Sequence, residues 1–186
     1  MVIKVAITGN IASGKSQVEK IIEDYGYNVY DSDKIAHEVL NTITDFYGYD
    51  VFTDGRIDRK KLGNLVFSNP NLRIKLEKIT HPKIKSKIIR LINENKNNKY
   101  VFISVPLLYE AGFEDIFDKV LFISVDKNIQ LKRLMARNNF TKEEAEKRIN
   151  SQLAQEEKIK NADYIIENNK SIDDLKIEVR KFLEVI

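Results

Sequence analysis

The sequence predicts an α/β fold in which a five-stranded parallel sheet is flanked by helices. Short apolar runs rich in β-branched residues alternate with amphipathic segments of helical spacing, and helices are the usual connection between parallel strands. A glycine-rich turn directly follows the first apolar run, which is the arrangement of a strand-loop-helix motif. With 186 residues and a hydrophobic content of 42%, the chain suits a single ordered domain with small insertions.

The first part of the chain is expected to form strand, helix, strand and helix in that order. Residues 2–7 are a β-branched apolar run, typical of a strand that is buried on both faces. Apolar residues at intervals of three and four predict a helix over 15–25. A second strand is expected at 27–30, followed by a helix at 32–40 for which Ser32 is a suitable N-cap.

The pattern changes over residues 41–98, where helical spacing predominates and no strand is evident. Helices are expected at 58–67, 70–79 and 82–94, in an interval divided by turn signals such as Asp54-Gly55. We therefore interpret this interval as a mostly helical insertion into the α/β pattern.

The alternation of strands and helices resumes after the insertion. Three further strands are expected, at 100–108, 119–125 and 164–166. Helical spacing is present around 129–135 and again at 172–183, where it predicts a closing amphipathic helix. The intervening charged stretch, 137–160, has few apolar positions, so we expect it to pack lightly and to be mobile.

Composition and charge exclude several classes of protein. The net charge is +3, and basic and acidic residues are interspersed, which argues against a nucleic-acid partner. The chain has no cysteine, so disulfide scaffolds, zinc-thiolate sites and thiol catalysis are excluded. The first apolar run is broken by Lys4 and Gly9, too soon for a signal peptide or a membrane span. We expect a cytoplasmic protein with no membrane partner.

The eight residues from Gly9 to Ser16 form the motif that predicts a function. They match the pattern G-x-x-x-x-G-K-[ST], between a predicted strand and a predicted helix, which is the context of a phosphate-binding loop. Glycines allow successive N–H groups to point at phosphate oxygens, and the helix N-terminus adds partial positive charge. Lys15 would then bridge the β- and γ-phosphates of a nucleoside triphosphate, and the Ser16 hydroxyl would ligate Mg²⁺.

Missing motifs narrow the class of nucleotide-binding protein. A guanine-specific GTPase needs an Asn-Lys-x-Asp base reader, whereas the nearest candidate here, residues 95–98, lacks the Asp. Large ATP-driven machines place an acid at the end of a buried strand, whereas the stretch at 103–108 has none. A small kinase remains. Such an enzyme needs a site for its acceptor and a residue that orients or deprotonates the acceptor hydroxyl.

Asp31 and Asp33 are candidates for that acceptor site. They follow the second predicted strand, and the carboxyl ends of parallel strands share the edge where ligands of open α/β sheets bind. Asp33 is suited to act as a base on an acceptor hydroxyl, although an acid at a helix N-terminus also needs no function. Arg137 is our first choice, ahead of Arg133 and Arg148, to neutralise the transferred phosphoryl group, with an ordinary solvated charge as the alternative.

The sequence resembles the dephospho-CoA kinase family over nearly its whole length. Besides the phosphate-binding loop, the similar stretches are Asp31 to His37, Gly55 to Leu62, Ile79 to Ile84, Val105 to Glu110, Gln130 to Arg137, Arg148 to Gln152 and Ala162 to Asn168. Members of this family transfer phosphate from ATP to the ribose 3′-hydroxyl of dephospho-CoA, the last step of coenzyme A synthesis. The resemblance implies ATP and dephospho-CoA as partners and Mg²⁺ as the metal that accompanies ATP.

The resemblance also implies an organisation and a set of roles. The α/β core would comprise 1–32, 98–136 and 159–186, with a helical substrate-binding insertion at about 33–97 and a helical lid at about 137–158. Asp33 would be the catalytic base, with Lys15 and Arg137 as its catalytic partners. The remaining residues implied are, for ATP, Ala12, Ser13, Gly14, Lys15, Ser16, Gln17 and Asn168, and for the acceptor, Asp31, Arg59 and His81.

The loop departs from the family pattern at three positions. Asn10 and Ala12 stand where the family usually has glycine, and Gln17 stands where it usually has threonine. Asparagine tolerates left-handed backbone angles and alanine is small, so we expect the loop to form with a modest effect on ATP affinity.

Two other functions are compatible with the same loop. One is another P-loop kinase with a small acceptor such as a nucleoside, a nucleotide or shikimate. The other is a nucleotide-sensing switch or scaffold that binds ATP beside an inert acceptor site. Phosphorylation of a panel of acceptors distinguishes all three.

Overall fold

The computed structural model describes residues 2–43, 46 and 49–186, and the chain divides into two compact units. One unit is made of the residues up to Asp31 together with those from Asn95 to Ile186. The other unit is the intervening segment from Ser32 to Glu94. The first unit contains the predicted parallel sheet, and the second is mostly helical.

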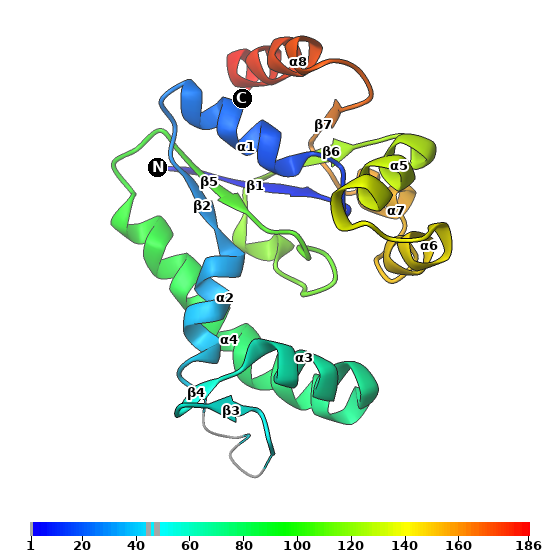
Figure 1. Ribbon diagram of the computed structural model, residues 1–186. Helices are drawn as coiled ribbons and strands as arrows, with labels where there is room; N and C mark the ends of the chain where they lie inside the picture. Colours follow the sequence, from blue (N-terminus) through cyan, green and yellow to red (C-terminus); the bar gives the residue numbers. More distant parts are fainter. Residues whose placement is uncertain (1, 44–45, 47–48) are drawn as a thin grey trace. The chain divides into compact units, whose positions relative to one another are not determined.

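The sheet of the first unit has five parallel strands in the order β2-β5-β1-β6-β7 (Figure 1). Its strands are β1 (Ile3–Gly9), β2 (Val29–Asp31), β5 (Tyr100–Ser104), β6 (Lys119–Ser124) and β7 (Tyr164–Glu167). Every residue of β5 is buried, which explains why the central strands are continuous apolar runs rather than alternating ones. The predicted α/β class with a five-stranded parallel sheet is confirmed.

Two helices, α1 (Lys15–Asp24) and α8 (Ile172–Val185), lie side by side on one face of this sheet (Figure 1). Each turns its apolar stripe inward, and together with strand residues they form the main core: Val5, Ile7, Val18, Ile21, Ile22, Tyr100, Phe102, Leu121, Ile123, Ile166, Leu175, Val179 and Phe182. A capping box at Ser171 and Asp174 starts α8. The closing amphipathic helix is therefore present, extended to Val185.

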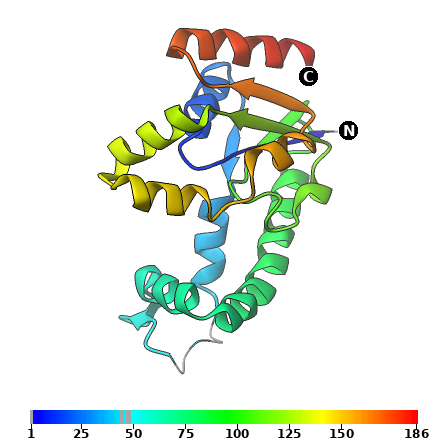
Figure 2. The same cartoon turned by 90° about the vertical axis from the view of Figure 1, so that its right-hand side faces the viewer.

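The charged stretch of the first unit forms two short helices, α6 (Lys142–Ile149) and α7 (Gln155–Ile159), after α5 (Lys127–Asn138). Helix α6 packs against α5, and α7 packs against β6 (Figure 2). The only fully buried apolar side chain of α6 is Ala145, as its narrow apolar stripe predicts. A one-turn 3₁₀ helix, Glu114–Ile116, connects β5 to β6.

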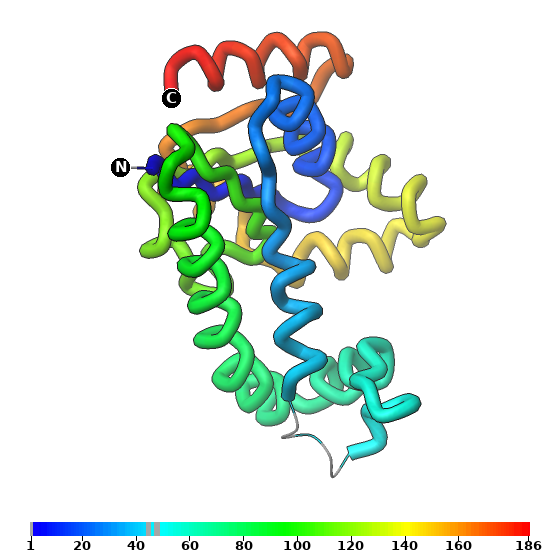
Figure 3. Tube along the Cα trace, turned by 90° about the vertical axis from the view of Figure 1, so that its left-hand side faces the viewer, coloured from blue at the N-terminus to red at the C-terminus, as the bar shows by residue number. Residues whose placement is uncertain are grey.

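The second unit consists of α2 (Ser32–Leu40), α3 (Arg59–Ser68), α4 (Pro70–Glu94) and a small hairpin. Helices α2 and α3 both pack against α4, and α2 runs beside it (Figure 3). A separate small core holds the unit together: Ile43, Phe46, Val51, Ile57 and Leu62. An exposed ion pair, Lys87 to Glu38 at 2.8 Å, links α4 to α2.

The expectation that residues 41–98 contain no strand is wrong. Strands β3 (Phe52–Thr53) and β4 (Arg56–Ile57) pair antiparallel around Asp54 and Gly55, whose φ angles are 50° and 73°. Two successive positive φ angles are the signature of a tight hairpin turn, for which Asp-Gly is a preferred sequence. The turn signal was correct, but two-residue strands are too short to show an alternating pattern.

The expected break between helices at 70–79 and 82–94 is also wrong, because α4 is assigned as one helix with Pro82 inside it. A proline inside a helix removes one backbone hydrogen bond and usually ends or kinks it. Here the helix is stabilised on both sides of Pro82 by buried residues: Thr80 before it and Ile84, Ile88 and Ile92 after it. Packing therefore outweighs the local preference.

Other elements differ from expectation by a few residues. The strand expected at 100–108 ends at Ser104, shortly before Pro106, which has no N–H to donate to a neighbouring strand. The second strand is shifted to Val29–Asp31. No helix among the described residues is both long and apolar enough to cross a membrane.

Candidate functional site

The loop that joins β1 to α1 has the backbone of a phosphate-binding loop. Ala12 and Gly14 have φ angles of 60° and 90°, in the left-handed region. Gly14 is the N-cap of α1 and has no side chain to fold over the helix end, so the N-terminus of α1 is left for a ligand. Ala12 is not a glycine, so it adopts the left-handed angle at a modest conformational cost.

Two glycines of the loop are required because other atoms occupy the space of a side chain. A Cβ on Gly9 would lie 2.7 Å from Ser13 Oγ and 2.8 Å from the carbonyl oxygen of Ile123. A Cβ on Gly14 would lie 2.0 Å from Nδ2 of Asn168. That amide is buried and donates a hydrogen bond of 2.8 Å to the carbonyl oxygen of Ser13, so Asn168 holds the loop from the end of β7.

We expect Gly14→Ala to lower the free energy of unfolding by about 3 kcal/mol, because it adds a clash with Asn168 to the cost of a left-handed alanine. Gly26→Ala is the matched control, since Gly26 has a φ of 89° and no atom of the described residues would lie within 4 Å of the added carbon. We expect it to cost about 1 kcal/mol. Urea unfolding of both variants measures the difference, and equal losses would show that the Asn168 contact contributes nothing.

Side chains from α5 and from the segment after α6 fix the other side of the loop. The N–H of Ile11 donates to Oε1 of Gln152 at 2.7 Å, and its carbonyl oxygen accepts from Nε2 of Gln130 at 2.8 Å. Nδ2 of Asn10 donates to the carbonyl oxygen of Leu153 at 3.1 Å. Asn10 therefore serves as a link to the 152–153 segment, which a glycine at this position cannot provide.

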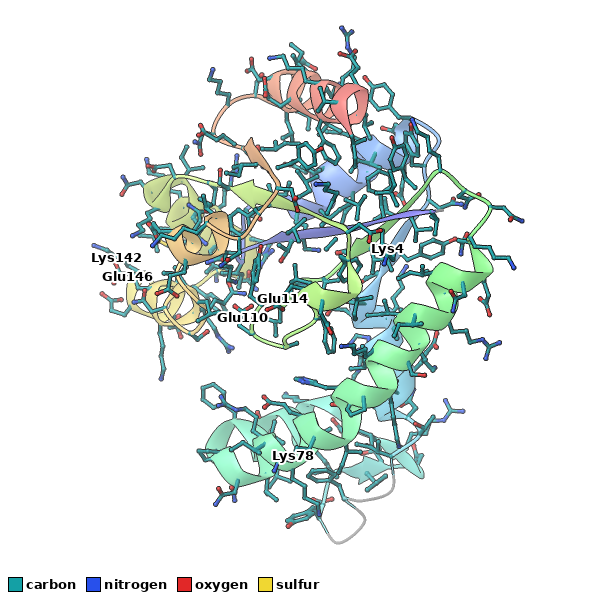
Figure 4. The ribbon with its side chains drawn as sticks, turned by 180° about the vertical axis from the view of Figure 1, so that it is seen from behind. Lys4, Lys78, Glu110, Glu114, Lys142 and Glu146 are labelled. Atoms are coloured by element: carbon teal, nitrogen blue, oxygen red, sulfur yellow. The ribbon has the colours of Figure 1, made fainter. Side chains whose placement is uncertain are left out.

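The 152–153 segment is itself anchored by Glu110, which lies after β5 and faces α7 (Figure 4). Oε1 of Glu110 accepts from the N–H of Leu153 at 3.2 Å and lies 2.6 Å from Nζ of Lys158. The Lys158 side chain is only 1% exposed, so its ammonium depends on this carboxylate for charge balance. Burial also raises the pKa of the neighbouring Tyr109 to about 12.

Glu110→Gln is expected to destabilise the fold by about 3 kcal/mol, because it leaves the buried ammonium of Lys158 without a countercharge. Lys158→Met removes the buried charge instead and leaves a carboxylate that is 21% exposed, so we expect a smaller loss. Chemical denaturation of the two variants tests this order. The reverse order would mean that water solvates Lys158 when its partner is removed.

Lys15, the lysine of the loop, is held by two partners within the protein. Its Nζ lies 2.6 Å from Oε1 of Glu19 and also donates to the Ser104 hydroxyl at the end of β5. Ser16 and Gln17 are exposed in the first turn of α1, directly after it. Ser13 Oγ is buried, with no hydrogen-bond partner among the residues that the structure describes.

The candidate arginines differ in their surroundings. Arg137 is exposed in the last turn of α5, and its Nε donates to Oδ1 of Asn138 at 2.9 Å. Nη1 of Arg133, one turn earlier, is buried and has no hydrogen-bond partner within the described ranges of the chain. A buried guanidinium nitrogen with no acceptor is a position where an anion is stabilising.

The acceptor candidates lie in and next to the second unit. Asp31 ends β2, and Asp33 is an exposed residue in the first turn of α2. Arg59 begins α3, and its Nη1 lies 3.0 Å from Nδ1 and 2.9 Å from Nε2 of His37 on α2. His81 lies in the middle of α4, one residue before Pro82.

The start of α3, which carries Arg59, is fixed by its N-cap. The side chain of Asp58 accepts hydrogen bonds from the N–H groups of Lys61 and Lys60. These bonds hold the pKa of the Asp58 carboxyl below its usual value, and the bond from Lys61 has the largest effect. The same bonds fix the first turn of α3, where Arg59 lies.

Sequence reasoning missed several residues that shape the loop. Gln130, Gln152 and Glu110 lie in family-like stretches, but nothing in the local pattern assigns them a contact with residues more than 40 positions away. Lys158 lies in a charged stretch that predicts a solvated face, yet it is buried. The contact of Glu19 with Lys15 was predictable, because Glu19 follows Lys15 by four residues and side chains at that spacing on a helix are neighbours.

Comparison with known proteins agrees with this geometry. Residues 3–174 match the model of the dephospho-CoA kinase family. A dephospho-CoA kinase from Fusobacterium nucleatum is 41% identical over 189 residues, covering 98% of this chain and 97% of that protein. The crystal structure of a Thermus thermophilus protein superimposes with a TM-score of 0.84 at 33% identity, covering 100% and 98% of the two chains. A dephospho-CoA kinase from Campylobacter jejuni gives 0.79 at 36% identity, covering 99% and 96%. The chain, with its phosphate-binding loop between β1 and α1, therefore belongs to the dephospho-CoA kinase family.

Proposed function

We propose that this kinase transfers the γ-phosphoryl group of ATP to the ribose 3′-hydroxyl of dephospho-CoA and so completes coenzyme A synthesis. The observation that carries the proposal is the family match across 3–174, which spans both units of the chain. The loop geometry supports it, because the left-handed Gly14 and the uncapped start of α1 suit a polyphosphate.

ATP is proposed to bind at residues 12–17, with backbone N–H groups and Lys15 on its phosphates and Asn168 beside the adenine. Asn168 already supports the loop through its bond to Ser13, so one residue would serve both tasks. The Ser16 hydroxyl, exposed next to Lys15, fits Mg²⁺, which usually takes one or two protein ligands and fills its shell with phosphate and water. When bound with ATP, this ion would neutralise charge on the β- and γ-phosphates.

The acceptor is proposed to bind in the insertion at about 33–97, with Asp31, Arg59 and His81 as its contacts. Asp33 takes the proton of the 3′-hydroxyl while the hydroxyl oxygen forms a bond to the γ-phosphorus and the bond to ADP breaks. The segment at about 137–158 acts as a lid, and Arg137 at its start neutralises the transferred group.

The experiment that tests the proposal is an acceptor panel with the full chain and Mg²⁺-ATP. We expect ADP release and a mass gain of one phosphate group with dephospho-CoA, and neither with a nucleoside monophosphate or shikimate. Turnover of one of those other acceptors alone would assign a different small-acceptor kinase. ATP binding without transfer to any acceptor would assign a nucleotide-dependent switch.

The site of action follows from the same proposal. We place the enzyme in the cytoplasm, because its co-substrate ATP is supplied there. The small and interspersed net charge of +3 supports small-molecule partners rather than nucleic acid.

A further inference from the structure

The ion pair between Lys15 and Glu19 has no part in the function proposed above. Nζ of Lys15 lies 2.6 Å from Oε1 of Glu19, and the two side chains are only 16% and 19% exposed. An ion pair with so little exposure is screened weakly by salt and water. It therefore has more influence on the ammonium than an ordinary surface pair would have.

The pair is built into the helix that begins at the loop. Lys15 and Glu19 are four residues apart in α1, so their side chains share one face, one turn from each other. Strand β5 ends in Ser104, whose hydroxyl is the second partner of Lys15, and not in an acid. The carboxylate beside the lysine of the loop thus comes from α1 rather than from the sheet.

Nucleotide phosphates and Glu19 compete for the same ammonium. A lysine has three N–H donors, and Glu19 and Ser104 accept two of them in this structure. A phosphate group bound to the same nitrogen lies next to the carboxylate, where two negative charges repel. Glu19 must therefore either release Lys15 or remain beside the phosphates, and both weaken nucleotide binding.

We propose that Glu19 is a positioning residue that acts through Lys15. It holds the ammonium extended toward Ser104 when the loop has no nucleotide, and it lowers the affinity of the loop for ATP and ADP. Weaker binding of ADP hastens product release, a step that limits the turnover of many enzymes. The proposal rests on the proposed role of Lys15 as a ligand of the β- and γ-phosphates.

Calorimetric titration of the full chain with ATP, ADP and adenosine tests this inference. Glu19→Gln is expected to lower the Kd of ATP and of ADP about tenfold, which is about 1.4 kcal/mol, and to leave that of adenosine unchanged. The gain should change little as salt is added, because a charge with so little exposure is screened weakly. Glu23→Gln, at an exposed position one turn further along α1, is the matched control and should change none of the three.

Unchanged or weaker binding of ATP and ADP by a folded Glu19→Gln variant would overturn the inference. Glu19→Asp keeps the charge but shortens the side chain, and we expect it to tighten binding less than Glu19→Gln; it also replaces that variant if Gln at this position prevents folding. Lys15→Met distinguishes the proposed role of Lys15 from the proposed role of Glu19. If Lys15→Met binds ATP as tightly as the parent, the phosphate role of Lys15 fails; if it loses ATP while Glu19→Gln changes nothing, the role of Glu19 alone fails.

Discussion

Replacement of Asp33 by asparagine is expected to lower kcat about 10³-fold, because the 3′-hydroxyl then has no base to take its proton. The change is isosteric and removes one charge from the first turn of α2, where the residue is exposed. The affinity for ATP should stay within about twofold, since Asp33 is not part of the phosphate-binding loop at residues 9–16. Initial rates with dephospho-CoA and calorimetric titration with ATP provide the two measurements.

Glu38→Gln is the matched control for this change. Glu38 is also an exposed carboxylate of α2. The hydrogen bond that it accepts from Lys87 is the main cause that holds its pKa below the usual value. Its replacement removes only a solvent-exposed ion pair, which contributes little to stability, and should leave kcat unchanged. If Asp33→Asn turns over as fast as the parent, another group takes the proton and Asp33 is an ordinary helix N-terminal acid.

Lys15→Met is expected to lower kcat/KM for ATP about 10³-fold, because the charge developing on the transferred phosphoryl group loses its ammonium. The loss should exceed the effect of removing a neutral hydrogen-bond donor from the loop. The Glu19 carboxylate, which lies 2.6 Å from Nζ in the parent, then faces the phosphates without a cation. Steady-state rates at varied ATP measure the effect.

Lys20→Met is the control for the lysine of the loop. Lys20 is exposed on α1, five residues further along the chain, and its loss changes the net charge of the protein by the same amount. We expect kcat/KM to remain within about twofold of the parent, because the charge of an exposed side chain is screened by water and salt. A similar loss in both variants would mean that the general charge of α1, and not Lys15 itself, attracts ATP.

Much of the architecture was predictable because its determinants are local. The apolar runs of β1, β5 and β6 and the stripes of α1 and α8 each lie within a few consecutive residues. The two errors, the hairpin around Asp54-Gly55 and the passage of α4 through Pro82, have a different origin. The first involves strands too short for any periodicity, and the second depends on packing that outweighs a local rule.

The sequence by itself determined the α/β class and the phosphate-binding loop, and it predicted Lys15 and Ser16 as the side chains of that loop that contact phosphate and metal. All of these follow from spacing along the chain, since the glycines, the lysine and the helix start are within eight residues. The tertiary structure decided what supports the loop. The supporting residues come from remote parts of the chain: Asn168, Gln130, Gln152, and Glu110 paired with the buried Lys158. Such contacts depend on which segments the fold places side by side, and no periodicity or local propensity specifies a partner more than 40 residues away.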